Sequence, residues 1–247
     1  MTDPRAAFGR AANYDAHART QRRVAASLAG RIAALPRPEA PRVLEIGCGT
    51  GFLTAALRPR IGGDWTVTDL APEMLARCRA RIGEAPGLRY RVLDGERPGL
   101  TEGGFDLICA SLAFQWFADL PAALARLRAL LAPGGRIAFA TMAEESFAEW
   151  RAAFAAAGLE PATPRYPSIA FLASLPGTTV GEEHIVEQHA DARAFLAALR
   201  GIGAHSPRAG HRPLSAAKLR RVMAAFEAGG ARVTYHVAYG VMTEEEK

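Results

Sequence analysis

Over residues 41–142, segments with the apolar pattern of a buried strand alternate with segments that have the apolar spacing of a helix. Apolar runs typical of buried strands occupy residues 41–47, 64–70, 88–94, 105–112 and 134–142. Residues 52–60, 72–83 and 119–131 carry apolar positions at helical spacing, with Pro72 in the first turn of the second segment and Asp119 at the start of the third. Strands that alternate with helices predict a doubly wound, Rossmann-like α/β sheet of mostly parallel strands, covered by helices on both faces.

This alternation changes after Met142. Helical patterns follow at residues 146–159, 168–175, 191–200 and 215–230, and strand patterns at 182–189 and 231–242. We expect the last two strands to pair, with an antiparallel final strand, and the intervening helices to form a helical cap over the carboxyl edge of the sheet. The prediction is a single domain over 1–247: an amino-terminal helical lid (1–40), a core (41–142), cap insertions and late sheet elements (143–230), and a last strand and tail (231–247).

Composition supports a folded protein with a buried core, because 49% of the 247 residues are hydrophobic. No apolar run approaches the roughly 18 residues that would span a bilayer. The arginine-rich amino terminus is not followed by the apolar stretch of a secretory signal, so the expected location is the cytoplasm and no membrane partner is expected. Cys48, Cys78 and Cys109 show no CxxC spacing and are expected to be reduced, structural thiols.

The net charge of +5 is concentrated at the two flanks of the chain. Residues 1–37 hold seven basic and two acidic residues, and residues 200–232 hold seven and one. Nucleic acid, an acidic protein or mere solubility would each explain this excess. An RNA-binding surface would interleave aromatic residues with the arginines, whereas residues 200–230 contain only Phe226. No nucleic-acid partner is therefore expected.

The stretch VLEIGCGTGF at residues 43–52 places three glycines directly after the first strand. Glycine permits positive φ and lets a ligand approach the main chain, and the carboxyl end of such a strand is where open α/β sheets bind ligands. The pattern is G-x-G-x-G: a dinucleotide fingerprint would need glycine at Phe52, and no Gly-Lys-Ser/Thr of a phosphate loop follows. Asp69 and Asp94 end the next two strands, where they either bind a ligand or merely cap loops.

Glu45, the three glycines and the two aspartates together resemble class I S-adenosylmethionine-dependent methyltransferases over residues 41–142. This resemblance implies S-adenosylmethionine as the cofactor, with the glycine loop near its methionine portion, Asp69 on the ribose and Asp94 near the adenine. This cofactor is a cation and has no phosphate group, so acidic side chains at the ends of the strands suit it. The predicted cofactor site consists of Tyr14, Gln21, Glu45, Gly47, Cys48, Gly49, Gly51, Asp69, Leu70, Met74, Asp94 and Gly95, with Tyr14 and Gln21 on an amino-terminal helix.

The stretch SLAFQWFADL at residues 111–120 follows the fourth strand, where this class of enzyme faces the reacting methyl group. The N/D-P-P-Y/F motif of enzymes that methylate exocyclic amino groups is absent. Gln115 offers an amide, and the Trp116 face can attract a sulfonium by about 0.5 to 2 kcal/mol. The alternative is that Trp116 and Phe117 only pack a helix against the sheet.

Four further segments carry a second resemblance: FGRAANYDAHARTQ (8–21), SLAFQWF, LRGIGAH (199–205) and TYHVAYGV (234–241). Together they resemble the malonyl-acyl-carrier-protein O-methyltransferases of biotin synthesis over nearly the whole chain. The resemblance implies transfer of a methyl group to the free carboxylate of a malonyl thioester on an acyl carrier protein. Methylation of a free small acid or another small-molecule acceptor, and a non-catalytic adenosylmethionine-binding subunit, remain alternatives.

A carboxylate acceptor needs no catalytic base, because a carboxyl group with a reference pKa of about 4 is already ionised at neutral pH. We therefore predict no acid/base residue and no metal. Arginine is the best anchor for a carboxylate; Arg151 is the first candidate and Arg200 the second. The alternative is that each is instead a solvated helix residue. Tyr235 and His236 are neighbours on the last strand. Successive side chains of a strand point to opposite faces of the sheet, so only one of the two can face a site.

A basic cluster near the end of the chain is the candidate docking surface for an acidic carrier protein. Its alternative is an ordinary solvated helix face. The cluster consists of Arg208, Arg212, Lys218, Arg220 and Arg221.

Overall fold

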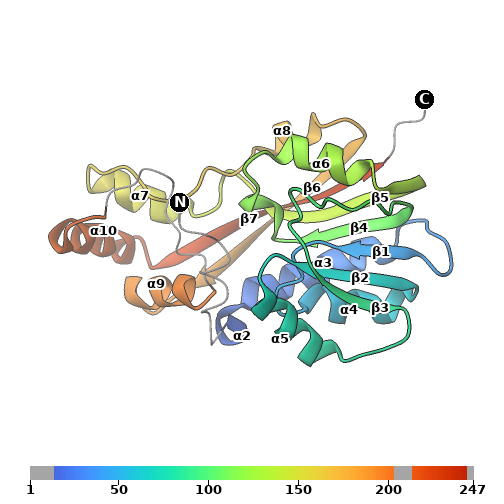
Figure 1. Ribbon diagram of the computed structural model, residues 1–247. Coiled ribbons are helices and arrows are strands. Elements are labelled where there is room, and N and C mark those ends of the chain that lie inside the picture. Colours follow the sequence, from blue (N-terminus) through green and yellow to red (C-terminus); the bar gives the residue numbers. More distant parts are fainter. Residues whose placement is uncertain (1–13, 203–212, 244–247) are drawn as a thin grey trace. The chain divides into compact units, whose positions relative to one another are not determined.

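The computed structural model describes residues 14–202 and 213–243. It contains one seven-stranded sheet with the strand order β3-β2-β1-β4-β5-β7-β6 (Figure 1). The strands are β1 (Arg42–Glu45), β2 (Asp64–Asp69), β3 (Leu88–Val92), β4 (Phe105–Ser111), β5 (Leu131–Met142), β6 (Thr178–Gln188) and β7 (Arg232–Thr243).

Helices connect the strands much as the apolar spacing predicts. They are α2 (Tyr14–His17), α3 (Arg19–Ala33), α4 (Phe52–Ile61), α5 (Pro72–Ile82), the 3-10 turn η1 (Phe114–Trp116), α6 (Leu120–Arg128), α7 (Ala148–Ala156), α8 (Ile169–Ala173), α9 (Ala192–Gly201) and α10 (Ala216–Ala228).

Several predicted boundaries were wrong. The helix expected over 119–131 ends at Arg128, and Leu131 already belongs to β5. The helix expected from residue 146 begins at Ala148, because Phe147 has a left-handed backbone with φ 61°. Strand β6 begins at Thr178 rather than at residue 182.

The chain divides into two compact units, each assembled from separate segments. The first unit consists of residues 1–18, 142–168 and 182–237, and the second of residues 19–141, 169–181 and 238–247. The predicted single domain with a lid and a cap stays a prediction.

The second unit contains the parallel part of the sheet. Strand β1 pairs in parallel with β2 on one side and with β4 on the other, so the strand order reverses at β1. Val43, Leu44 and Ile108 are fully buried, as expected for strands covered on both faces. Figure 1 shows α3, α4 and α5 along one face of these strands and α6 along the other. The predicted doubly wound arrangement is confirmed, and its switch point at β1 is where such sheets bind ligands.

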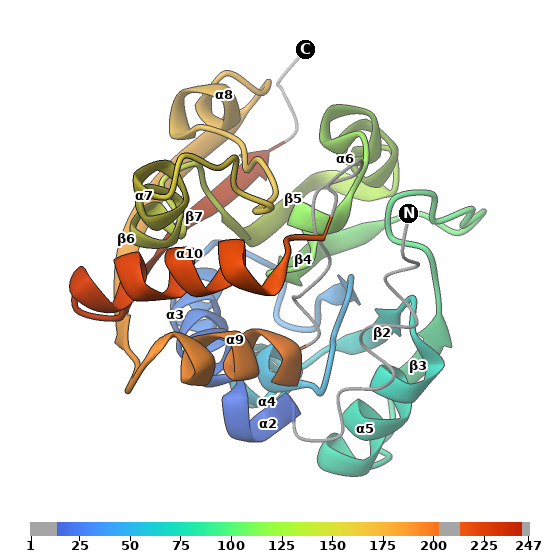
Figure 2. The same ribbon diagram turned by 90° about the vertical axis from the view of Figure 1, so that its left-hand side faces the viewer.

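The first unit is built around aromatic side chains. The Trp150 ring lies 5.2 Å from the rings of both Phe195 and Phe226, between centroids, and these three side chains are buried. They come from α7, α9 and α10, the three helices of the unit that Figure 2 shows side by side. The four helices expected after Met142 are therefore present; α7, α9 and α10 share one core, while α8 belongs to the second unit.

The last two strands run antiparallel, as predicted. The Ala231 carbonyl accepts a hydrogen bond from the His189 N–H, while at the other end the Gly177 carbonyl accepts one from the Thr243 N–H. Strands β6 and β7 are neighbours in the sheet order. Among the described residues, no helix combines the length and the apolar character needed to cross a membrane.

Candidate functional site

The glycine turn after β1 leaves one stretch of main chain open. Gly47, Gly49 and Gly51 all have positive φ, of 66°, 54° and 88°. A Cβ atom on Gly47 would lie 2.6 Å from Ala113 Cβ, and one on Gly51 would lie 2.8 Å from Cys78 Sγ. A Cβ atom on Gly49 would meet nothing within 4 Å. Packing thus requires the two outer glycines, while the bare backbone of Gly49 lies next to open space that a ligand can occupy.

Asp69 joins the end of β2 to this turn. Its Oδ2 accepts a hydrogen bond from the Gly49 N–H at 2.8 Å, and its Oδ1 accepts one from the Ala71 N–H at 2.8 Å. Burial raises the pKa of Asp69 above its ordinary value, although these hydrogen bonds oppose the shift. A carboxylate offers about four acceptor sites, and Asp69 uses three of them for the main-chain N–H groups of Gly49, Leu70 and Ala71, so it keeps acceptor capacity for a ligand.

Glu45 is buried at the end of β1, with 1% of its surface exposed. Its Oε2 accepts a hydrogen bond from Thr54 Oγ1 at 2.7 Å. Burial raises the pKa of Glu45 to about 7, and the nearby charge of Asp69 contributes to the same direction. A cationic ligand beside this carboxyl group would favour its ionised form.

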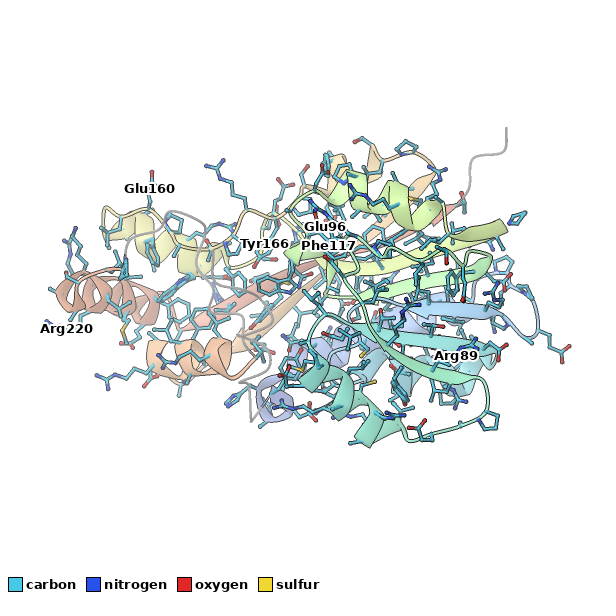
Figure 3. All side chains as sticks on the ribbon, in the orientation of Figure 1. Arg89, Glu96, Phe117, Glu160, Tyr166 and Arg220 are labelled. Atoms are coloured by element: carbon cyan, nitrogen blue, oxygen red, sulfur yellow. The ribbon has the colours of Figure 1, made fainter. Side chains whose placement is uncertain are left out.

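The end of β3 is tied to the segment after β4. Asp94 is exposed and accepts a hydrogen bond from the Glu96 N–H at 3.0 Å. The Glu96 carboxylate accepts hydrogen bonds from the main-chain N–H groups of Ala118 and Asp119, at 3.0 and 2.9 Å, and Figure 3 shows Glu96 next to Phe117. A Cβ atom on Gly95 would lie 2.2 Å from Ile46 Cγ2 and 3.2 Å from Phe117 Cζ. The glycine at position 95 is therefore a packing requirement, and Glu96 is a connecting residue that no sequence motif indicates.

The segment after β4 begins with a strained residue, Leu112, at φ 53°. Gln115 Nε2 donates to the Leu112 carbonyl at 2.8 Å, and Gln115 Oε1 accepts a long hydrogen bond from Thr141 Oγ1 at 3.4 Å. Trp116 is half-buried. Gln115 thus holds the turn that brings Ala113 against Gly47.

The remaining predicted cofactor residues of the second unit differ in exposure. Cys48 and Met74 are buried, whereas Gln21 and Leu70 are half-buried. Cys48, Cys78 and Cys109 are all buried and unpaired, as predicted. A hydrogen bond with Cys78 and burial raise the pKa of Cys48 well above its ordinary value, so this thiol is not a nucleophile at neutral pH.

The two candidate arginines differ in their surroundings within the first unit. Arg151 is half-buried in α7 and donates a hydrogen bond to the Ser146 carbonyl, whereas Arg200 is exposed near the end of α9. Burial raises the pKa of Tyr166, and the nearby charge of Arg151 lowers it. The Arg151 guanidinium therefore acts electrostatically on the Tyr166 phenol, a residue that no sequence motif indicates. Tyr14, the predicted cofactor residue of this unit, lies half-buried in α2.

Tyr235 and His236 are both buried, and their side chains have different neighbours. The Tyr235 ring packs edge-on to Phe147 at 5.2 Å, between centroids, and its hydroxyl contacts the Glu187 carboxylate. His236 Nε2 instead lies 2.8 Å from Glu182 Oε2. Opposite orientations are what the period of a strand predicts.

The candidate docking cluster is described only in part. Lys218 and Arg220 are exposed on α10, and Figure 3 labels Arg220 there. Arg221 Nη2 donates to the Ala157 carbonyl at 3.1 Å, so this side chain also packs α10 against the end of α7. Arg208 and Arg212 lie outside the described residues, as do residues 8–13 and 203–205 of the second resemblance.

Comparisons with known proteins identify the class first. Residues 44–139 match the model of a methyltransferase domain family. A putative methyltransferase from Bacillus halodurans has a similar fold, with a TM-score of 0.63 at 13% identity over 90% of this chain and 99% of that chain. The YcgJ protein from Bacillus subtilis gives a TM-score of 0.61 at 15% identity with the same coverage. The two structures show a Rossmann-like α/β fold, and the matched family model places residues 44–139 among methyltransferase domains.

Curated relatives narrow this class. A malonyl-[acyl-carrier protein] O-methyltransferase from Magnetococcus marinus is 47% identical over 96% of this chain and 90% of that protein. The biotin biosynthesis bifunctional protein BioCD from Bordetella avium is 53% identical over 92% of this chain, which spans about half (49%) of that protein. The chain belongs to the malonyl-[acyl-carrier protein] O-methyltransferase family.

Proposed function

We propose that this protein transfers the methyl group of S-adenosylmethionine to the free carboxylate of malonyl-acyl-carrier protein, giving a malonyl methyl ester for biotin synthesis. The observation that carries the proposal is the 47% identity, over 96% of the chain, to the Magnetococcus protein of that name. The chemistry of the described residues agrees with it at three points: the cofactor, the acceptor and the carrier.

The glycine turn and its carboxyl groups fit S-adenosylmethionine. The open main chain at Gly49 accommodates a ligand, Asp69 retains acceptor capacity for a ribose diol, and Glu45 can balance positive charge. No cationic side chain is needed for a phosphate, because this cofactor has none. When bound, it supplies an electrophilic methyl group. The other residues proposed to line its site are Tyr14, Gln21, Gly47, Cys48, Gly51, Leu70, Met74, Asp94 and Gly95, with Gln115 and Trp116 on the acceptor side.

The acceptor is proposed to be held by Arg151, with the Tyr166 hydroxyl as a second donor. A malonyl carboxylate is ionised at neutral pH, so catalysis consists of aligning one of its oxygens with the methyl group rather than of removing a proton. Arg151 is favoured over Arg200 because it is half-buried, and partial burial strengthens an ion pair. Methylation removes the negative charge that Arg151 holds, which promotes release of the ester.

The carrier protein is proposed to dock on the basic cluster that includes Lys218 and Arg220. Carrier proteins are typically acidic, so opposite charges would accelerate the encounter. A soluble carrier substrate also implies a cytoplasmic location, without nucleic acid or membrane as a partner.

The test is methyl transfer from labelled S-adenosylmethionine to malonyl-carrier protein, malonyl-coenzyme A and free malonate, compared side by side. We expect the methyl ester to form most efficiently on malonyl-carrier protein. Ester formation on free malonate alone would favour the alternative of a small-acid methyltransferase. Cofactor binding without a methyl ester on any of the three would favour a non-catalytic subunit and defeat the carboxylate assignment.

A further inference from the structure

Two imidazoles and two carboxylates form a cluster in the first unit, apart from the residues assigned to the cofactor or the acceptor. The rings of His184 on β6 and His236 on β7 are stacked, with centroids 4.3 Å apart and planes inclined by 14°. His184 Nε2 lies 2.8 Å from Glu145 Oε2, and His236 Nε2 lies 2.8 Å from Glu182 Oε2. Glu145 belongs to the segment after β5, so three separate segments meet at this cluster.

We propose that Glu145, His184 and His236 bind a divalent transition-metal ion such as Zn²⁺, with Glu182 as the supporting carboxylate. Each of the three residues offers one ligand atom, and these atoms all lie within 4.8 Å of one another. Imidazole nitrogen and carboxylate oxygen are ligands that Zn²⁺ binds at about 2.0 to 2.2 Å, so these atoms must come closer together to share one ion. Imidazole ligands favour Zn²⁺, Co²⁺, Ni²⁺ or Cu²⁺ over Mg²⁺ and Ca²⁺.

Charge favours a cation at this cluster. The carboxyl groups of Glu145 and Glu182 each lie 2.8 Å from a histidine nitrogen, and histidine ligates metals in its neutral form. With both carboxyl groups ionised and both rings neutral, the cluster carries a charge of about −2, which one divalent ion balances. Glu182 also resembles the carboxylates that orient metal-binding histidines, because it contacts Nε2 of His236. The ion would then bind Nδ1 of that ring and replace the long, 3.3 Å hydrogen bond that Nδ1 accepts from the Glu145 main-chain N–H.

The exposure of each side chain indicates which of them can move when an ion binds. The side chains of Glu145, His184 and Glu182 are 64%, 44% and 51% exposed, whereas that of His236 is 3% exposed. Because the two rings are stacked, their in-plane lone pairs do not meet at one point. His184 must therefore rotate toward the fixed His236 when the ion binds, and its exposure leaves room for this rotation. Ion binding replaces the stacked pair by two rings that ligate the same ion.

The site is connected to the proposed acceptor anchor. Glu145 precedes Ser146, whose carbonyl accepts the hydrogen bond from Arg151. An ion would fix this segment against β6 and β7, and so limit the movement of Arg151. This consequence rests on the proposed function, whereas metal binding itself does not.

The experiment uses the full chain without an affinity tag, freed of metal by a chelator. It is titrated with Co²⁺, followed by visible absorption, and with Zn²⁺, followed by calorimetry. We expect one ion per chain and a loss of affinity of at least about tenfold in both His184→Ala and Glu145→Gln. His17→Ala, which removes an exposed imidazole from α2, should bind as the wild type does.

The proposal is overturned by a wild-type protein that takes up no ion, or by His184→Ala and Glu145→Gln proteins that bind as tightly as the wild type. The second outcome would assign the ion to other groups, such as the thiols. Excess Mg²⁺ should not displace Co²⁺, and equal binding of Mg²⁺ would also contradict ligation by imidazole. Circular dichroism checks that each variant is folded. Neither S-adenosylmethionine nor a malonyl acceptor is needed, so this result is independent of the methyl-transfer test.

Discussion

The main-chain N–H of Gly49 donates a 2.8 Å hydrogen bond to Asp69 Oδ2, which joins the turn after β1 to the end of β2. The two residues are the centre of the proposed cofactor site, and each has a different part in it. Gly49 supplies open backbone, and Asp69 supplies acceptors. Substitutions can therefore separate the shape of the turn from its hydrogen bonding.

Asp69→Ala is expected to weaken S-adenosylmethionine binding by at least tenfold, or about 1.4 kcal/mol. The variant removes both the proposed ribose contact and the bond that positions Gly49. Asp64→Ala, at the exposed start of the same strand, is the matched control and should bind normally. Calorimetry measures both affinities. Unchanged cofactor affinity in Asp69→Ala would show that Asp69 does not bind the ribose.

Gly49→Ala and Gly158→Ala, the latter just after α7, form a matched pair. Both glycines have positive φ, of 54° and 67°, and an added Cβ atom would meet nothing within 4 Å at either position. The backbone strain should therefore cost each variant a similar amount of stability, about 1 to 2 kcal/mol.

Only Gly49→Ala should also lose cofactor affinity, because its methyl group would enter the space proposed for the ligand. Denaturant unfolding and calorimetry measure the two effects separately. Equal cofactor affinity in the two variants would show that the ligand does not approach Gly49.

Sequence patterns predicted the parallel core because each of its strands is a short apolar run bounded by polar or glycine residues. They failed where apolar character continues across a boundary. The segment from Leu127 to Leu131 is apolar apart from Arg128, so periodicity does not distinguish the end of α6 from the start of β5. The predicted helix start at residue 146 was wrong for another reason. The left-handed backbone of Phe147 follows from tertiary packing and not from the propensity of phenylalanine.

The candidate site was predictable to the extent that it is local in sequence. The glycine turn and Asp69 could be found because turn chemistry and strand ends fix their positions. Tyr166 and the cluster of Glu145, His184 and His236 come from segments far apart in the chain, with no characteristic spacing. Their association depends on how β6, β7 and the segment after β5 pack, which one-dimensional periodicity does not encode.

Glu45 should make stability depend on pH. Burial raises its pKa from 4.5 to about 7 in the folded protein, so between these values the folded state holds a proton that the unfolded state has released. The resulting stability is fully present below pH 4.5 and is lost as the pH rises through about 7. The size of this loss is on the order of 3 kcal/mol.

Denaturant unfolding of the wild type and of Glu45→Gln, from about pH 5 to about pH 8, measures this contribution. The free energy of unfolding of the wild type should fall relative to that of the variant as the pH rises. Glu73→Gln, at an exposed position in α5, should keep the wild-type dependence. Parallel curves for wild type and Glu45→Gln would contradict the assignment.

Arg151→Ala is expected to raise the KM for malonyl-carrier protein while leaving the affinity for S-adenosylmethionine unchanged. A lost charge-assisted hydrogen bond of about 1.5 to 3 kcal/mol corresponds to roughly ten- to hundredfold in kcat/KM. Arg151→Lys should recover only part of this loss, because an ammonium group cannot make the paired contacts of a guanidinium. Arg193→Ala, exposed on α9, is the control. Normal turnover in Arg151→Ala would show that Arg200 or another residue, and not Arg151, binds the acceptor carboxylate.

The combined variant Lys218→Glu and Arg220→Glu should lower kcat/KM for malonyl-carrier protein but not for malonyl-coenzyme A. Both side chains are exposed on α10, so charge reversal opposes an acidic carrier without removing packing. Arg221 is left unchanged because it also donates to the Ala157 carbonyl. The difference from wild type should shrink as ionic strength rises toward about 0.5 M, since salt screens exposed charges.

The control is Arg89→Glu with Arg91→Glu, on exposed positions of β3, which makes the same change in net charge elsewhere. An equal loss in that control would mean that net charge, and not a docking surface on α10, governs the encounter.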